Sequence, residues 1–289
     1  MNEGSGGTGP RVVALGGGHG LAASLRAARR YARQVTAVVS TADDGGSSGV
    51  LRRSLGAVPP GDLRKCLVAL SDPSSLWARA FEYRFADGHA LGNLIIAGLA
   101  EVGGDLQVAL DEAASLLAAG GRVLAATTEP VVLRASSEER LVEGQAAVSR
   151  IGGITRISLS PVGAVVPEAV TAALEESDQI VLGPGSLFTS VLAVAVLAPI
   201  AAALKRAAGR LVYVCNLRPQ IPETEGYDVA AHVRALHGHG IEPEAVLCDT
   251  SRMSRGSPTG IQVIEAELTS NEGDGHDPAL LAEALSRLY

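Results

Sequence analysis

Short apolar segments alternate with amphipathic segments along almost the whole chain, and this alternation is the strongest constraint on the fold. Apolar runs of about four to six residues favour buried strands, whereas apolar residues spaced three and four apart favour helices with one buried face. Strands separated by helices pair in parallel, because a parallel pair needs a long crossover connection. We therefore expect an α/β fold: a Rossmann-like, mainly parallel sheet with helices on both faces.

The expected strands cover Val12–Leu15, Val35–Ser40, Arg122–Ala126, Val131–Ala135, Ile154–Leu159, Gln179–Leu182, Leu211–Cys215, Ala245–Cys248 and Ile261–Glu265. The expected helices cover Leu21–Arg33, Asp62–Leu70, Ser74–Phe85, Leu91–Val102, Leu106–Leu117, Glu168–Glu175, Leu187–Ala207, Val229–Leu236 and Pro278–Leu288. Between residues 120 and 161, strand-like pieces lie close together without a full-length helix between them, which predicts a small antiparallel addition to the main sheet.

Residues 1–10, "MNEGSGGTGP", are rich in glycine and serine and lack the basic and apolar regions of an export signal, so we expect a flexible N-terminal lead. Residues 11–289 are expected to form a single α/β domain. The longest apolar stretch, Val191–Leu204, contains Pro199 and is shorter than the roughly 20 residues of a membrane span. We expect no membrane insertion and a cytoplasmic location.

The chain carries 24 Lys and Arg against 31 Asp and Glu, a net charge of −7, which argues against a nucleic-acid partner because such partners need a basic surface. Its three cysteines are widely spaced, with no CxxC pair, and are expected to be buried free thiols. Aromatic residues make up 3% of the chain and leave few large anchors for an interface. A homodimer built from aliphatic helix faces stays open.

The segment "RVVALGGGHGLAASL", residues 11–25, places four glycines between an expected strand and an expected helix. A helix N-terminus offers unpaired backbone N–H groups and partial positive charge, so Gly17, Gly18 and Gly20 predict a site for an anion such as phosphate. The alternative is that the glycines only allow close packing of strand and helix. The dinucleotide pattern G-x-G-x-x-G is not met, since Leu21 occupies its last position, and no G-x-x-x-x-G-K-[ST] pattern occurs.

Two adjacent carboxylates, Asp43 and Asp44, follow the second expected strand in "TADDGGSSG". Adjacent negative charges are costly unless a cation or several N–H donors share them. We predict that Asp43 and Asp44 provide the carboxylates of a Mg²⁺ site that bridges a diphosphate, because Mg²⁺ usually takes one or two protein carboxylates. The alternative is a turn in which Asp44 caps local N–H groups.

Further polar residues lie at the starts of expected helices. Asp62 is expected to be an N-cap, and Arg64 in the first turn faces either an anionic ligand or solvent. The side-chain amide of Asn93 suits contact with ribose or phosphate.

A second strand, turn and helix follow in "QIVLGPGSLFTSVL", where Ser186 and Thr189 bring hydroxyls to another helix start. The strand that ends at Asn216 is followed by a polar set, Gln220, Glu223 and Thr224. The two glycine turns would face one crevice if their strands lie at the topological switch point of the sheet.

The motifs "ALGGGHGL", "TADDGGSSGVLR", "PPGDLRKCLVAL", "LGNLIIAGL", "LGPGSLFTSVL", "VYVCNL" with "ETEGYDVAAHV", and "HDPALLAEAL" occur in this order over nearly the whole chain. Together they resemble the YvcK-type gluconeogenesis factors, which are similar to the 2-phospho-L-lactate transferases. The resemblance implies a protein that binds UDP-sugars such as UDP-N-acetylglucosamine. It also implies support of cell-wall synthesis and cell shape on gluconeogenic carbon sources, with cell-wall synthesis or regulatory proteins as partners.

The resemblance further implies that residues 11–289 form one nucleotide-sugar-binding domain. Its crevice would use Gly17, Gly18, Gly20, Asp43, Asp44, Ser47, Ser48, Asn93, Gly185, Ser186, Thr189, Asn216, Gln220, Glu223 and Thr224. Two segments depart from the family pattern: Arg218-Pro219 stands where relatives tend to carry a Met-Thr pair, and Gly275 stands where they often carry an arginine.

The resemblance favours a regulatory binder over an enzyme. The alternative is a Mg²⁺-dependent transferase, in which a substrate hydroxyl attacks a nucleotide-linked phosphorus, with His19 and Asp62 as candidate proton acceptors. An NAD-dependent oxidoreductase is a third class, and the incomplete glycine pattern and the doubled aspartate argue against it.

Overall fold

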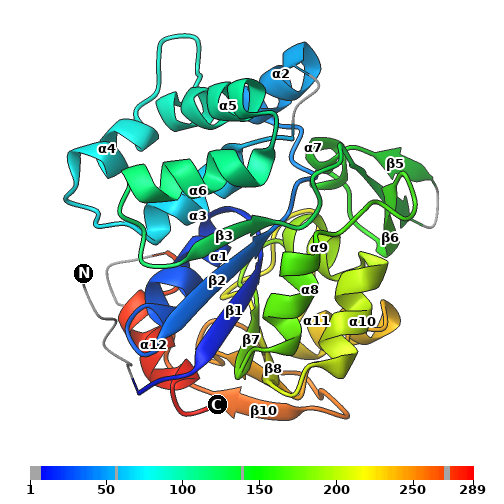
Figure 1. Cartoon of the computed structure of the whole chain (residues 1–289). Helices are drawn as coiled ribbons and strands as arrows, with labels where there is room; N and C mark the ends of the chain where they lie inside the picture. Colours follow the sequence, from blue (N-terminus) through cyan, green and yellow to red (C-terminus); the bar gives the residue numbers. More distant parts are fainter. Residues whose placement is uncertain (1–7, 56–57, 138–139, 270–273) are drawn as a thin grey trace.

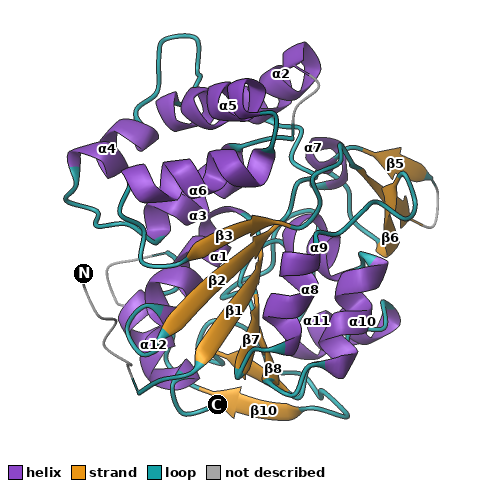
Figure 2. Cartoon of the chain, viewed as in Figure 1, coloured by secondary structure: helices purple, strands orange, loops and turns teal. Residues whose placement is uncertain are grey.

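The computed structural model describes residues 8–55, 58–137, 140–269 and 274–289. Within these residues a seven-stranded sheet runs in the order β10-β9-β8-β7-β1-β2-β3 (Figures 1 and 2), and every neighbouring pair is parallel. Its strands are β1 (Arg11–Gly16), β2 (Gln34–Val39), β3 (Arg122–Ala125), β7 (Gln179–Leu182), β8 (Arg210–Val214), β9 (Ala245–Cys248) and β10 (Gln262–Glu265). The expected α/β class and the strands expected for this sheet are confirmed.

The chain builds this sheet in two directions from β1. It first adds β2 and β3 on one side, and later returns to place β7 on the other side of β1, followed by β8, β9 and β10. The reversal between β1 and β7 is a topological switch point, where the connections after neighbouring strands leave toward opposite faces. A crevice is expected there, at the carboxyl ends of the strands.

Helices cover both faces of the sheet (Figure 2). One core is closed by α1 (Gly18–Ala28), α3 (Gly61–Ala69), α6 (Leu106–Leu116) and α12 (Pro278–Leu285), and the other by α8 (Glu168–Glu175), α10 (Ala198–Arg206) and α11 (Val229–Gly238). The side chains of β1 alternate between them: Val12 and Ala14 join the first core, whereas Val13 and Leu15 join the second.

A small antiparallel sheet lies beside the main one, with the order β5-β4-β6 and the strands β4 (Val132–Ser137), β5 (Leu141–Glu143) and β6 (Ile154–Ser160). It confirms the antiparallel addition expected between residues 120 and 161. The sequence pattern does not predict β5 or the short helix α7 (Gln145–Val148), because segments of three and four residues are too short to show a period.

The crossover from β2 to β3 forms a helical insertion. It carries α2 (Gly46–Leu55), α3, α4 (Leu76–Glu82), α5 (Leu91–Gly103) and α6, and its α2, α4 and α5 part stands above the sheet in Figure 1. Helix α2 begins inside "TADDGGSSG", where glycine and serine have low helix propensity. The sequence pattern therefore fails to predict α2.

The prediction of a single helix over Leu187–Ala207 is wrong. The chain forms a π-helical segment, η1 (Leu187–Leu192), a short α9 (Ala193–Ala195) and then α10, with a 74° bend between the two apolar pieces. Pro199 lies in the first turn of α10, where its ring and missing N–H end the preceding helix. No single described helix is long and apolar enough to cross a membrane. The bent pair Leu187–Ala195 and Ala198–Arg206 has sufficient length and apolar composition only when its two pieces are taken together.

Three smaller expectations are resolved by the structure. Helix α1 ends at Ala28 rather than Arg33, and the N-cap of α3 is Pro60, so Asp62 lies in the first turn of α3 and is not its N-cap. The cysteines are buried free thiols, as expected. Residues 1–7 of the expected N-terminal lead lie outside the described residues.

His232 on α11 is fully buried against the rings of Tyr213 and Tyr227. Its Nδ1 lies 2.8 Å from the Asp228 backbone oxygen, and since a carbonyl oxygen only accepts, Nδ1 carries the hydrogen. Burial lowers the pKa of His232, and Asp228 opposes this effect in part. The ring is therefore held neutral in the folded protein.

We expect this buried ring to make the fold sensitive to mild acid. Below about pH 6.5, the ordinary histidine pKa, the unfolded chain binds a proton that the folded chain excludes, so the free energy of unfolding falls as the pH falls. His232→Gln keeps an N–H donor for Asp228 but cannot titrate. Between about pH 7 and pH 5.5 it should lose about 1 kcal/mol less stability than the unmutated protein in urea denaturation. His237→Gln on the same helix is the control, and equal losses in H232Q and the unmutated protein would contradict the assignment.

Candidate functional site

Two glycine turns meet at the switch point. The first, Gly16–Gly20, spans the end of β1 and the first turn of α1, and the second, Gly183–Ser186, follows the neighbouring strand β7. A Cβ added at Gly20 would lie 2.3 Å from the Pro184 backbone oxygen, so only glycine lets the two turns touch. The turns lie against each other, as expected for strands on either side of a switch point.

The N-terminus of α1 is open to an anion. Its N-cap is Gly17, which supplies no side-chain acceptor, and Gly18 has a φ of +66° with no atom within 4 Å of an added Cβ. The first-turn amides and the helix dipole together give this end partial positive charge. Both expected roles of the glycines are therefore present: close packing at Gly20 and an accessible helix end at Gly18.

A cavity of about 210 Å³ opens beside the two turns. It is lined by Gly20, Pro184, Gly185, Asn216, Leu217, Arg218, Gln220, Asp274, Gly275 and His276. Four of these are predicted site residues, from three segments far apart in the sequence. Both segments that depart from the family pattern also reach this lining, through Arg218 and Gly275, and Arg218 pairs with Asp274 at an Nη1–Oδ1 distance of 3.2 Å on the exposed rim.

Asn216 ties the end of β8 to the second glycine turn. Its Oδ1 accepts a hydrogen bond from the Gly185 amide at 3.1 Å. Its Nδ2 is buried and has no partner among the described residues, and the same holds for Oε1 of Gln220. Two residues of the cavity lining therefore each carry a buried polar group, one donor and one acceptor, that the described protein does not use.

Sequence reasoning does not assign His276, which precedes α12 in the "HDP" motif and also lines this cavity. Its Nε2 lies 3.1 Å from the Cys215 backbone oxygen, so Nε2 carries the hydrogen and Nδ1 remains an acceptor in the neutral ring. Burial lowers the pKa of His276, while the bond to Cys215 and the charge of Asp249 act in the opposite direction. The "HDP" motif is the sequence signal that could have pointed to His276, but the motif does not show which residues His276 contacts.

Carboxylates lie on the other side of the α1 N-terminus. Burial raises the pKa of Asp43, and the nearby charge of Asp62 raises it further, against opposing hydrogen bonds from Gly45 and Ser48. Asp62 directs Oδ2 at Gly17, where an added Cβ would lie 2.6 Å away, and its Oδ1 lies 3.0 Å from the Lys65 ammonium. A carboxylate thus faces the turn that is open to an anion.

Asp44 points away from this group. Its Oδ1 accepts from the Ala146 amide in the first turn of α7 at 2.8 Å, so it joins the β2 end to the small-sheet region. The alternative that Asp44 caps local N–H groups differs from this contact, because Ala146 is distant in sequence; the local amide of Gly45 donates to Oδ1 of Asp43 instead. Within the described ranges, no three His, Cys, Asp or Glu side chains form a group that could hold a metal ion. A Mg²⁺ site at Asp43 and Asp44 stays a prediction.

A chain of hydrogen bonds holds Ser47 and Asn93 in the helical insertion. Arg64 Nε donates to Asn93 Oδ1 at 3.0 Å, Asn93 Nδ2 donates to Ser47 Oγ at 3.0 Å, and Ser47 Oγ lies 2.9 Å from His89 Nδ1. Arg64 also pairs with Glu82 on α4 and is 2% exposed. The expectation that Arg64 faces a ligand or solvent is wrong, because its charge is buried between α4 and Asn93.

The two remaining predicted serines differ in their surroundings. Ser48 is buried, and its hydroxyl accepts from the Gly61 amide at 3.1 Å, which fixes the start of α3 against α2. Ser186 is the N-cap of η1, is partly exposed, and makes no side-chain capping bond. Ser186 is the last residue of the second glycine turn, whereas Ser48 lies in α2.

Glu223 stabilises the start of η1. It is 3% exposed and accepts from the Phe188 amide at 2.9 Å and from the Thr189 hydroxyl at 3.1 Å. Burial raises the pKa of Glu223, and these hydrogen bonds oppose the rise. Thr224 Oγ1 accepts a hydrogen bond from the backbone N–H of Gln220 at 2.8 Å. Thr189, Glu223 and Thr224 therefore shape the loop beside the cavity and are absent from the described lining.

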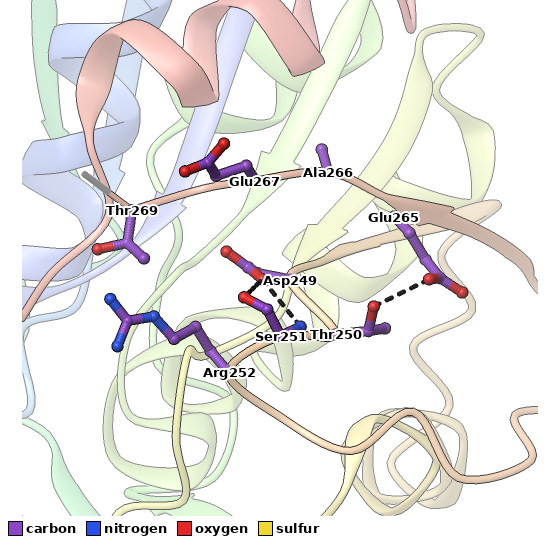
Figure 3. A pocket seen from close by; sticks show the side chains of 8 residues that line it. All are labelled: Asp249, Thr250, Ser251, Arg252, Glu265, Ala266, Glu267 and Thr269. Atoms are coloured by element: carbon purple, nitrogen blue, oxygen red, sulfur yellow. Dashed lines mark hydrogen bonds between the residues drawn. The ribbon is translucent and has the colours of Figure 1, made fainter. Parts of the chain in front are cut away.

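A larger cavity, of about 750 Å³, lies at the carboxyl ends of β9 and β10 (Figure 3). Asp249 at its centre accepts from both the amide and the hydroxyl of Ser251. The lining carries three carboxylates, Asp249, Glu265 and Glu267, against one guanidinium, Arg252. The smaller cavity is the better candidate for a diphosphate ligand because it lies beside the two glycine turns and the open N-terminus of α1.

Comparison with known proteins points to one family. The family model described as 2-phospho-L-lactate transferase CofD matches residues 12–269. A protein named "Putative gluconeogenesis factor" from Mycobacterium tuberculosis is 39% identical over 305 residues, a match that covers 95% of this chain and 89% of the relative. A "Gluconeogenesis factor" from Halalkalibacterium halodurans is 39% identical over 235 residues, covering 79% of this chain and 73% of that protein.

Two further similarities concern length and fold. A relative from Nostoc sp., with the same name as the mycobacterial protein, is 38% identical over 97% of this chain, and the chain spans 62% of that relative's length. A crystal structure of a UPF0052 family member from Bacillus halodurans superposes with a TM-score of 0.90 at 32% identity, covering 98% of this chain and 99% of that one.

Gly20→Ala should destabilise the fold. The added methyl group would meet the backbone oxygen of Pro184, which cannot rotate away, so the free energy of unfolding should fall by about 1–3 kcal/mol. Gly98→Ala on α5 is the control, because its methyl group would meet no atom within 4 Å. That variant should be neutral or stabilised by about 0.5–1 kcal/mol. Chemical denaturation that shows equal stability for both variants would argue against the close contact of the turns.

Proposed function

This chain belongs to the CofD family and, within it, to the gluconeogenesis factors, and from that premise we propose that it binds UDP-sugars of the UDP-N-acetylglucosamine type at the switch point. The observation that carries the proposal is the contact of two glycine turns beside a cavity with polar walls. An open helix N-terminus favours a diphosphate, and the cavity offers hydrogen-bonding groups for the rest of the ligand.

In this proposal the protein is a cytoplasmic regulatory binder. It would sense a UDP-sugar and pass that state to a partner in cell-wall synthesis, and so support the cell wall and cell shape on gluconeogenic carbon sources. The contacts of two side chains favour binding over catalysis. Ser47 is held between Asn93 and His89 in the helical insertion, and Lys65 pairs with Oδ1 of Asp62, so both side chains have structural partners.

A Mg²⁺-dependent transferase is the second candidate, and the surroundings of His19 favour it. His19 is an exposed residue of the first glycine turn, close enough to Asp62 and Lys65 to respond to their charges. Partial burial lowers the pKa of His19, and Lys65 lowers it further, so the ring is neutral near pH 7 and can accept a proton. Such a group could serve a substrate hydroxyl that attacks the nucleotide phosphorus.

Mg²⁺ is part of both candidates, and the position of Asp62 supports a cation. Its carboxylate faces the turn proposed for the diphosphate, and two anions so placed repel each other. Lys65 covers one oxygen of Asp62 and leaves Oδ2 toward the turn. Asp43 and Asp62 together fit Mg²⁺, which usually takes one or two protein carboxylates, whereas Asp44 is engaged with Ala146. Bound Mg²⁺ would neutralise charge on the diphosphate.

Calorimetry with UDP-N-acetylglucosamine and Mg²⁺ tests the proposed ligand. We expect the unmutated protein to bind and Gly18→Ala to bind at least about tenfold more weakly, because the added methyl group occupies the space of the anion. Gly104→Ala is the matched control: its φ of +68° imposes the same backbone strain at the end of α5, and its affinity should not change. The proposal fails if the unmutated protein does not bind or if G18A binds equally well.

The dependence of binding on Mg²⁺ should separate Asp43 from Asp44. In Asp43→Asn, the gain in UDP-sugar affinity that Mg²⁺ produces should be lost, because a ligand carboxylate has been removed. In Asp44→Asn the gain should persist, with stability lowered by about 1 kcal/mol as the bond to Ala146 weakens. Titrations with Mg²⁺ and with EDTA measure both effects. Retention of the gain in D43N would remove Asp43 from the proposed site and leave Asp62, whereas loss of the gain in D44N alone would move the cation to Asp44.

A further inference from the structure

Two amide side chains at the cavity wall each carry a buried polar atom without a partner among the described residues: Nδ2 of Asn216 and Oε1 of Gln220. Asn216 is 8% exposed, and both residues line the cavity of about 210 Å³ beside the glycine turns. A buried donor or acceptor left unbonded costs about 1–3 kcal/mol. A ligand that enters this cavity recovers that cost when the two side chains turn these atoms toward it.

The second glycine turn fixes the polarity of Asn216. The Gly185 N–H can only donate, so the atom that it contacts at 3.1 Å must be the side-chain oxygen, and Nδ2 is left as a donor. Neutral His276 offers no further donor to the cavity, because its Nε2–H donates to the backbone oxygen of Cys215. Gln220 presents Oε1 as the acceptor. These two side chains therefore favour a ligand group that accepts a hydrogen bond from Asn216 and donates one to Gln220.

We propose that Asn216 and Gln220 select a planar group with one C=O and one N–H, that is, a secondary amide or an imide. Its carbonyl would accept from Asn216 Nδ2, and its N–H would donate to Gln220 Oε1. This inference rests on the proposed function, in which the diphosphate lies on the neighbouring turn and one end of the ligand reaches the cavity. A UDP-sugar carries a C=O and an N–H in two places: side by side in the uracil ring, and on opposite sides of the trans acetamido group of an N-acetylated sugar. The two groups therefore require different placements of the Asn216 and Gln220 side chains.

Other ligand groups match the pair less well. A phosphate or carboxylate oxygen only accepts, so it would leave Gln220 Oε1 unbonded and would be repelled by it. A sugar hydroxyl has one hydrogen on one oxygen, so it serves both side chains only if they converge on a single atom. Cytosine places its donor and acceptor in the reverse order of uracil around the ring. The pair therefore discriminates by the order of donor and acceptor.

Ratios of dissociation constants test this selectivity. UDP-N-acetylglucosamine, UDP-glucose and CDP-glucose are titrated by calorimetry, with Mg²⁺, into the unmutated protein, Asn216→Asp and Gln220→Met. Asn216→Asp keeps an oxygen for Gly185 but replaces the donor by an acceptor, and Gln220→Met removes the acceptor at similar volume. The added negative charge of Asn216→Asp weakens the binding of all three ligands by the same factor, so this effect cancels in the ratios of dissociation constants. Thermal unfolding confirms folding, and Gln220→Met carries the test if N216D does not fold.

Two results would support the inference and identify the group. If it is uracil, the unmutated protein binds UDP-glucose at least about tenfold more tightly than CDP-glucose, and both variants shrink that ratio, with Asn216→Asp able to reverse it. If it is the acetamido group, the unmutated protein prefers UDP-N-acetylglucosamine to UDP-glucose by about tenfold, and both variants remove the preference.

Unchanged ratios in folded variants would overturn the inference, because the two amides would then bond only to each other or serve the fold. A uniform loss of affinity with unchanged ratios would also overturn it, in favour of hydroxyl recognition. In both cases the unmutated protein still binds UDP-sugars, so the proposed function would stand. Absence of binding of all three ligands to the unmutated protein would refute the proposed function and this inference together.

Discussion

The contact between the first glycine turn and the Pro184 carbonyl is the constraint on which the site depends. It requires the absence of a side chain at Gly20, where a Cβ would lie 2.3 Å from that oxygen. Because β1 and β7 are neighbours, this contact joins the two halves of the doubly wound sheet at their ends. Asn216 then binds the Gly185 amide and adds the end of β8. Three distant segments are thereby fixed around one helix N-terminus.

Charge is distributed unevenly around that helix end. On the insertion side, Asp62 faces the open turn, and Asp43 lies close enough to Asp62 to respond to its charge. A chain of bonds from buried Arg64 holds the insertion in place. On the other side, the cavity carries neutral amide groups from Asn216 and Gln220. A ligand with a cation-bound anionic centre and a neutral polar arm fits this arrangement. The cavity at β9 and β10 is lined by residues from outside the two glycine turns.

The main sheet could be predicted because short buried strands and amphipathic helices have different periods, and because the ends of parallel strands share one edge. That second rule also places the glycine turns together. The sequence misleads where a local residue overrides the pattern, as Pro199 does in the long apolar helix. It also misleads where a role depends on a distant partner. Buried Arg64 pairs with Glu82, and Asp44 accepts a hydrogen bond from Ala146, and no local spacing indicates these contacts.

A crystal structure of the protein with UDP-N-acetylglucosamine and Mg²⁺ would test the binding site most directly. We expect diphosphate oxygens within hydrogen-bonding distance of the main-chain amides between Gly18 and Gly20, and one end of the ligand in the cavity lined by Asn216 and Gln220. A ligand seated in the cavity lined by Asp249 and Arg252, with the glycine turns left free, would contradict this site.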